Sequence, residues 1–349
     1  MTLQETVQSI KKPDEKAMEQ CKKRWNSIAK PLNSLGKMED FLVKIAGMTG
    51  SSQIDLGKKG LVIMCADNGV VEEGVTQTGQ EVTAIVAENF LKNQATASIM
   101  SRKVGADVFP VDIGIASDTV LPNRKVAYGT KNMTKEPAMT REEAVKALET
   151  GIAIVEELKE KDYRILATGE MGIGNTTTSS AVTAVLLGLE PEQVTGRGAG
   201  LSSQGLERKI NAIKRAIACN RPDPADGVDI LAKVGGFDLA GLAGVFLGGA
   251  ANGIPIVIDG FISAAAALAA AAICPEAKSY MIPSHISKEP GARLIMEALG
   301  LEGALDMDMC LGEGTGAVTL FPILDLACCV YDSMSTFQDI HVEEYKPLV

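Results

Sequence analysis

Short apolar runs alternate along the chain with longer segments of helical period. Residues 60–67, 107–114 and 163–170 each form an apolar run that ends in an acidic residue or glycine, as expected of buried parallel strands. Helices are expected between and after these strands, at about 81–104, at about 141–159 and from about Thr176 onward. Strand, glycine turn and helix repeat in this order, which predicts βαβ units and a doubly wound α/β fold with a parallel sheet.

Both ends of the chain carry a different pattern. The first 50 residues are rich in charge and place apolar residues at helical spacing, and residues 321–337 have the period of an amphipathic helix. We therefore expect a small helical domain built from residues 1–50 and 321–349, beside a large α/β domain of residues 51–320. Right-handed crossovers in the large domain would gather the carboxyl ends of its strands, with their polar residues, along one edge.

The charge and the cysteine and histidine content narrow the possible partners. The 349 residues carry a formal net charge of −10, which argues against nucleic acid, because affinity there comes largely from Lys and Arg. The chain has only two histidines and no spaced Cys/His set, so we expect neither a metal site nor a metal cofactor. Seven cysteines without a C-x-x-C pair, and a first segment without the pattern of a signal peptide, indicate a cytoplasmic location.

One uncharged run, from Leu239 to Ile258, is long enough to cross a membrane. Glycines interrupt it, residues 252–255 have the composition of a turn, and residues 256–258 resemble a short buried strand. We therefore expect this run in the protein core and predict no membrane partner.

The segment E-M-G-I-G-N-T-T, from Glu170 to Thr177, joins a predicted strand to a predicted helix. Backbone N–H groups and the helix dipole favour an anion at such a place, so this loop is a candidate phosphate site. It matches neither a Walker loop nor the dinucleotide pattern G-x-G-x-x-G. The alternative is a tight turn in which Thr176 or Thr177 caps the helix.

The segment L-G-E-G-T-G-A places Glu313 between Gly312 and Gly314, with no cationic neighbour nearby in the sequence. A glutamate flanked by glycines can be approached closely by a substrate. Apolar surroundings disfavour the anion and so prepare a carboxylate to act as a base. The alternative is a glycine loop that ends a helix and leaves the glutamate in solvent.

Two further groups of residues could complete an anion site. Arg197 and Lys209 supply cations in an otherwise acidic chain, and the segment from Ser284 to Ser287 supplies hydroxyl groups. Each group is also compatible with an ordinary solvated turn. Ser287 lacks the pattern of a histidine and acid partner, so a serine hydrolase is disfavoured.

Several segments resemble, in order, those of the nicotinate-nucleotide–dimethylbenzimidazole phosphoribosyltransferases of cobalamin synthesis. The resemblance extends from about Lys30 to Phe337. Its segments are K-P-L-N-S-L-G at 30–36, the loop at 170–177, V-G-G-F-D at 234–238, I-D-G-F-I-S at 258–263, P-S-H at 283–285 and L-G-E-G-T-G at 311–316.

This resemblance implies an architecture and a reaction. The architecture is a doubly wound parallel-sheet (Rossmann-like) domain with a small helical domain from both chain ends, in a homodimer whose active sites lie near the subunit interface. In the reaction, 5,6-dimethylbenzimidazole or a related base attacks C1′ of nicotinate mononucleotide, which releases nicotinate and forms α-ribazole 5′-phosphate. Nicotinate leaves as a neutral ring nitrogen, so neither an acid nor magnesium is needed, and we expect no cofactor.

The resemblance also implies roles for individual residues. Glu313 would accept the N–H proton of the attacking base, and Glu170 would lie near the ribose, where a carboxylate supports positive charge at C1′. The 5′-phosphate would be held by the loop amides of Gly172 and Gly174, with Asn175 and Thr176 in the same loop, and by Lys209 and Ser287. The base pocket would be lined by Asp259, Leu311 and the segment from Thr78 to Val86.

Two positions depart from the family pattern. Asn68 stands where many members have histidine, and Val86 stands where some have glutamine beside the base. We expect these changes to affect which base is preferred, and the acceptor could be another benzimidazole, a purine or a phenolic compound. Two rival functions remain open from the sequence: a nucleotide- or corrinoid-binding sensor without activity, and a nucleosidase that uses water in place of the base.

Overall fold

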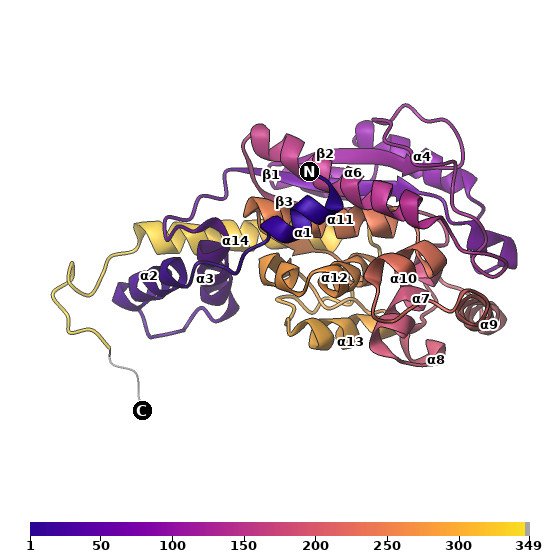
Figure 1. Cartoon of the computed structure of the whole chain (residues 1–349). Helices are drawn as coiled ribbons and strands as arrows, with labels where there is room; N and C mark the ends of the chain where they lie inside the picture. Colours follow the sequence, from indigo (N-terminus) through magenta and orange to yellow (C-terminus); the bar gives the residue numbers. More distant parts are fainter. Residues whose placement is uncertain (346–349) are drawn as a thin grey trace.

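The computed structural model describes residues 1–345 and contains a five-stranded, fully parallel sheet in the order β2-β1-β3-β4-β5 (Figure 1). The strands are β1 (Lys58–Ala66), β2 (Ala106–Gly114), β3 (Tyr163–Met171), β4 (Ile256–Ile258) and β5 (Met281–Pro283). The chain steps from β1 outward to β2 and then returns past β1 to β3, so the winding direction changes between β1 and β3. The predicted doubly wound α/β fold is confirmed, and ligands in such sheets bind at the carboxyl ends of the strands.

Helices cover both faces of the sheet. One face packs against α4 (Glu81–Leu91), α5 (Thr96–Lys103) and α14 (Thr315–Ser333), and the other against α6 (Arg141–Glu160), α11 (Phe237–Asn252) and α12 (Phe261–Ile273). The single helix expected at 81–104 is therefore two helices. The chain turns between them at Asn93, which has a positive φ of 59° and cannot continue a right-handed helix.

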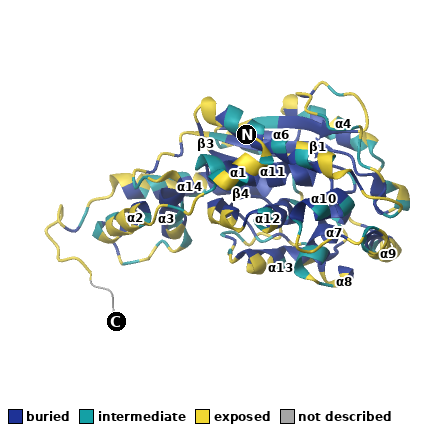
Figure 2. Ribbon diagram, viewed as in Figure 1, coloured by how far each residue is buried: buried dark blue, intermediate teal, exposed yellow. Residues whose placement is uncertain are grey.

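Glycines allow α6 and α11 to pack with their backbones in contact. A Cβ atom on Gly151 would collide with the carbonyl oxygen of Gly241, and one on Gly244 would collide with that of Leu148. All residues of α11 from Phe237 to Ala250 are buried (Figure 2). The uncharged run from Leu239 to Ile258 is thus core helix, turn and strand, as predicted. Within the described residues only α14 is long and apolar enough to span a membrane, and half of its most apolar stretch is buried inside the protein.

The remaining elements extend the side of the sheet that carries α12 and close the strand ends (Figure 1). They are η1 (Gly69–Glu73), α7 (Asn175–Leu187), α8 (Pro191–Val194), α9 (Ser203–Asn220), α10 (Gly227–Val234), η2 (Pro275–Tyr280) and α13 (Pro290–Leu299).

A separate group of helices projects from the sheet beside the second half of α14 (Figure 1). It contains α2 (Glu15–Ser27) and α3 (Lys37–Thr49), and the rings of Trp25 and Tyr331 meet at 5.0 Å. The first helix, α1 (Leu3–Ser9), instead packs against α6 and α11. The expected boundary between residues 320 and 321 falls inside the continuous helix α14, and the division of the chain into two domains stays a prediction.

Candidate functional site

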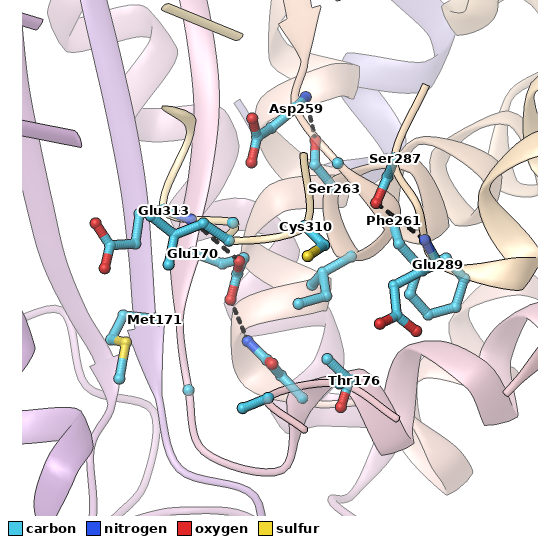
Figure 3. A pocket seen from close by; sticks show the side chains of 18 of the residues that line it. Glu170, Met171, Thr176, Asp259, Phe261, Ser263, Ser287, Glu289, Cys310 and Glu313 are labelled. Atoms are coloured by element: carbon cyan, nitrogen blue, oxygen red, sulfur yellow. Dashed lines mark hydrogen bonds between the residues drawn. The ribbon is translucent and has the colours of Figure 1, made fainter. Parts of the chain in front are cut away.

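A cavity of about 300 Å³ opens at the carboxyl ends of β3, β4 and β5. The structure brings nine of the predicted site residues into its wall: Val86, Glu170, Gly172, Asn175, Thr176, Asp259, Ser287, Leu311 and Glu313 (Figure 3). They come from several separate parts of the chain, which supports the expectation that strand ends gather polar residues along one edge.

Three predicted site residues do not line this cavity. Lys209 lies behind its wall and reaches it through Thr176, whose hydroxyl accepts a hydrogen bond from Lys209 Nζ at 2.8 Å. Gly174 lies at the start of α7 and contributes its backbone conformation there. Thr78 is exposed in the loop before α4. Of the segment predicted to line the base pocket, residues 78–86, only Val86 reaches the cavity.

The loop after β3 delivers the open end of a helix to the cavity. Gly174, with a positive φ of 94°, precedes the first residue of α7, and no side chain caps this helix. Neither Thr176 nor Thr177 is the cap, so that alternative is wrong, although the turn itself is tight. The N–H groups of Asn175 and Thr177 donate to the carbonyl oxygens of Gly172 and Gly174, at 3.1 and 2.9 Å, so an anion here would be attracted by the helix dipole together with the Thr176 hydroxyl and the Lys209 cation.

Lys209 is almost completely buried, with 1% of its surface exposed. Its ammonium group also donates to the carbonyl oxygen of Gly196 at 3.2 Å. Burial lowers the pKa of Lys209 to about 8, because the charged form loses hydration, while the Glu289 carboxylate acts in the opposite direction. By contrast, the predicted cation Arg197 turns back on its own loop and donates to the carbonyl oxygen of Leu201 at 2.7 Å.

Glu170 occupies the centre of the cavity wall and is buried. Its carboxyl group accepts a hydrogen bond from the side-chain amide of Asn175 and a longer one, of 3.4 Å, from the backbone N–H of Glu313. Burial and the nearby Asp238 raise the pKa of Glu170 to about 8. The site therefore contains a carboxyl group that titrates far above its usual range.

The glycine loop around Glu313 has an unusual backbone. Gly312, Glu313 and Gly314 all have positive φ, of 88°, 61° and 90°. For a glutamate this conformation costs about 1–2 kcal/mol, so the surrounding structure must hold it. A Cβ atom on Gly312 would collide with the carboxyl group of Glu170, so only glycine allows the loop to approach this group. Gly314 begins α14, and the alternative that this loop ends a helix is wrong.

The Glu313 side chain is half-buried and points to the side of the cavity that carries Met171 (Figure 3). Its Oε2 accepts the backbone N–H of Ala97, at the start of α5, at 3.2 Å. No hydrogen bond to Oε1 occurs among residues 1–345. Burial is the main cause that raises the pKa of Glu313. One oxygen is thus anchored while the other can accept a proton, which is the arrangement a general base requires.

Asp259 contributes to the site through the backbone. Its two carboxylate oxygens accept the N–H groups of Gly314 and Ala317, at 3.1 and 3.0 Å, in the first turn of α14. Burial raises the pKa of Asp259, and the nearby charge of His285 acts in the opposite direction. We predicted Asp259 as a wall of the base pocket; the structure places it in the cavity wall and also uses it to hold the glycine loop.

Several residues of the cavity were not predicted from the sequence. They include Met171, Phe261, Glu289 and Cys310. Met171 lies inside the predicted loop at 170–177, and Cys310 directly precedes the segment that begins at Leu311, so their position in the sequence was an available signal. Glu289 gave no such signal, because an acidic residue before proline is an ordinary start for a helix, here α13.

Comparison with known proteins identifies the class of this chain. Residues 10–342 match a family model described as phosphoribosyltransferase. Two curated relatives, from Ruminiclostridium cellulolyticum and Acetivibrio thermocellus, are each 51% identical and are each named nicotinate-nucleotide–dimethylbenzimidazole phosphoribosyltransferase. The alignments cover 100% of both chains for the first and 99% of both for the second.

A solved structure agrees with this assignment. The crystal structure of CobT from Thermus thermophilus superposes with a TM-score of 0.90 at 39% identity and covers 95% of this chain and 100% of that chain. The chain therefore belongs to the nicotinate-nucleotide–dimethylbenzimidazole phosphoribosyltransferase family, as the resemblance of its sequence segments indicated.

Proposed function

We propose that this protein transfers the phosphoribosyl group of nicotinate mononucleotide to 5,6-dimethylbenzimidazole or a related base, within the assembly of the cobalamin nucleotide loop. The observation that carries the proposal is the pairing, in one cavity, of an uncapped helix start with a half-buried glutamate anchored by a single oxygen. The first feature suits a phosphate, and the second suits removal of a proton from an azole.

The two ends of the cavity divide the substrates between them. Thr176, Ser287 and Lys209 lie toward one end, and we assign the 5′-phosphate to them together with the amides of the loop after β3. Glu313 and Met171 lie on the other side of Glu170 (Figure 3), and we assign the acceptor base to that end. Val86 and Leu311 also line the cavity and are the apolar side chains that we assign to the base. The ribose then bridges the two ends with its C1′ beside Glu170.

Glu313 is the proposed catalytic base. As the unprotonated azole nitrogen attacks C1′, the ring becomes cationic, and the proton on the other ring nitrogen passes to the free oxygen of Glu313. Proton transfer to a positioned carboxylate contributes about 10²–10⁴ in rate. The C1′–N bond to nicotinate breaks with its electron pair on the pyridine nitrogen, so the leaving group departs neutral.

We also propose a homodimer. The helices α4, α5 and α14 pack together on one face of the sheet and carry exposed apolar side chains. These are Ile85, Ile99 and Leu326, with 58%, 48% and 60% of their surfaces exposed. Leu311, at the cavity, is 56% exposed. A second copy covering this face would bury these side chains. We place the protein in the cytoplasm, supported by its seven free cysteines.

The test is a product analysis. The protein is incubated with nicotinate mononucleotide, with and without dimethylbenzimidazole, and free nicotinate and α-ribazole 5′-phosphate are measured by chromatography. We expect nicotinate and the phosphate product in equal amounts, and fast release only when the base is present. Release of nicotinate without the base, at the same rate, would instead identify a nucleosidase.

A further inference from the structure

A buried acidic residue lies next to the catalytic site and has no role in the reaction described so far. Asp238 belongs to the sequence V-G-G-F-D and lies in the first turn of α11, with none of its surface exposed. It does not line the cavity. Its carboxylate accepts the backbone N–H of Leu239 at 2.9 Å.

Asp238 lies beside the loop that carries Glu170. A Cβ atom on Gly172, two residues after Glu170, would lie 2.7 Å from Asp238 Oδ2, and this oxygen accepts no hydrogen bond among residues 1–345. The carboxyl group of Glu170 accepts a hydrogen bond from the side-chain amide of Asn175. Glu170 and Asp238 are therefore two buried carboxyl groups at the same loop, and one oxygen of Asp238 has no hydrogen-bond donor there.

The surroundings supply no cation to neutralise this pair. Neither residue forms a salt bridge among residues 1–345. The charged groups nearby are other acids, or cations that already have an acidic partner. Among the acids, Asp67 accepts the N–H of Ala116, Asp259 accepts an N–H at the start of α14, and Glu313 accepts the N–H of Ala97. Of the cations, Lys125 pairs with Asp112 at 2.9 Å, and His285 lies beside Asp259. Two buried carboxylates that share a site without a cation cannot both ionise near neutral pH.

The unequal environments decide which of the two carries the charge. Asp238 lies at a helix start, where the dipole and the Leu239 N–H favour an anion. Glu170 has one amide donor and one long backbone contact. The pKa of Asp238 accordingly rises only to about 6, whereas that of Glu170 rises to about 8, with the charge of Asp238 as a cause second to burial.

We propose that Asp238 is a positioning residue for the transfer reaction, whose buried carboxylate beside the loop of Glu170 keeps the carboxyl group of Glu170 protonated while the donor site is empty. This inference rests on the proposed function. When nicotinate mononucleotide binds, its pyridinium cation lies beside Glu170 and favours the carboxylate. The O–H bond of Glu170 then breaks, the proton passes to solvent, and the carboxylate that remains faces the positive charge developing at C1′.

A nucleotide with a cationic base compensates the new negative charge at Glu170, whereas a nucleotide with a neutral base, such as adenosine 5′-monophosphate, does not. Proton release should therefore accompany binding of the first and not of the second. The Asp238 carboxylate thus helps the site to select a donor by the charge of its base.

The experiment is calorimetric titration with nicotinate mononucleotide at pH 7, in buffers of different ionisation enthalpy, which gives the number of protons released. We expect about 0.9 protons per site from the wild-type protein, since a group with a pKa of about 8 is mostly protonated at pH 7. In Asp238→Asn the neighbouring charge is gone, the pKa of Glu170 is lower, and the release should fall below the wild-type value. The matched control is Asp67→Asn, which removes another buried acid at the same sheet edge and should behave like the wild type.

The pH profile of kcat/KM separates this role from a merely structural one. In Asp238→Asn the acid limb should move to lower pH, because Glu170 ionises more easily, whatever the change in amplitude. Structural damage alone would lower kcat/KM at every pH and leave the limb in place, and that result would overturn the inference.

A measurement on the wild-type protein covers the case in which Asp238→Asn does not fold. Infrared difference spectra should show loss of a protonated carboxyl band when nicotinate mononucleotide binds, and this signal should be absent in Glu170→Gln. Binding without proton release and without this band change overturns the role of Asp238 and leaves the donor assignment standing. Failure of nicotinate mononucleotide to bind at all overturns both.

Discussion

The backbone N–H of Gly314 donates to Asp259 across 3.1 Å, so the residue that follows β4 fixes the glycine that begins α14. The same carboxylate accepts the N–H of Ala317 one turn further on. The position of Glu313, one residue before Gly314, therefore depends on a side chain that is distant in sequence and has both oxygens engaged with the backbone.

Replacing Asp259 by Asn should loosen this connection. Asparagine keeps one acceptor but loses the charge and the second acceptor, so we expect a loss of about 1–3 kcal/mol in the free energy of unfolding and a lower kcat. Urea denaturation and steady-state kinetics measure the two effects. Asp325→Asn, on the same helix, removes only a pair with Lys59 whose aspartate is 42% exposed, and should cost about 0–1 kcal/mol without changing kcat. Equal effects of the two substitutions would contradict this role of Asp259.

Replacing Glu313 by Gln should separate binding from turnover. The amide keeps an oxygen for the Ala97 N–H but cannot accept the azole proton, so kcat should fall about 10²–10⁴-fold, with the dissociation constant for nicotinate mononucleotide nearly unchanged. Rapid-quench kinetics and calorimetry provide the two measurements. Glu302→Gln, at a surface pair with Lys37, serves as the control. Turnover at the wild-type rate would remove Glu313 from its proposed role.

Replacing Lys209 by Met should weaken donor binding and alter its pH dependence. Loss of a charge-assisted contact to phosphate should raise KM for nicotinate mononucleotide about 10–100-fold, which corresponds to ~1.5–3 kcal/mol. Because a lysine is cationic below its pKa, the wild-type affinity should decline as pH rises through about 8, and the variant should lack this decline. Lys214→Met, on the exposed side of the same helix, should retain it. A decline that persists in Lys209→Met would assign it to another group.

Replacing Gly312 by Ala tests the approach of the glycine loop to Glu170. The added methyl group would collide with the Glu170 carboxyl group and also strain a residue with positive φ, so we expect kcat/KM to fall on the order of 10²-fold. Gly300→Ala has a similar positive φ of 68° but meets no atom within 4 Å, and so reports the backbone strain alone. Thermal unfolding of both variants measures that strain. If both lose the same activity, the collision is not the cause.

Local patterns in the sequence were sufficient for the fold and for part of the site. Apolar runs identified β1, β2 and β3 to within a few residues, because buried parallel strands must be apolar along their length. Parallel strands also meet at one edge, which is why Glu170 could be expected there, whereas Ser287 was placed beside it by the resemblance to the family. The break between α4 and α5 was missed, because a single residue with positive φ, such as Asn93, changes the local composition very little.

Contacts between distant segments could not be predicted. The N–H of Ala97 lies 216 residues from Glu313 along the chain, and nothing near either residue indicates the hydrogen bond between them. The exposed position of Thr78 was equally inaccessible, because the path of the loop before α4 depends on the elements that it crosses. Asp238 was recognised only as part of a family segment, and its effect on Glu170 depends on burial that composition does not reveal.

Helix α14 has one end at the catalytic glycine loop and the other against α2, where Arg24 donates to the carbonyl oxygen of Met334, 310 residues away along the chain. Since the ribosome synthesises the chain from its amino end, α2 and α3 leave the ribosome before α14. Until α14 packs against them, the apolar side of Trp25 is exposed to solvent. During that interval the nascent protein is a natural client for a chaperone. Among residues 1–345, α14 is the last helix in the sequence and completes both the bundle and the loop of Glu313, so the site cannot form before α14 has left the ribosome.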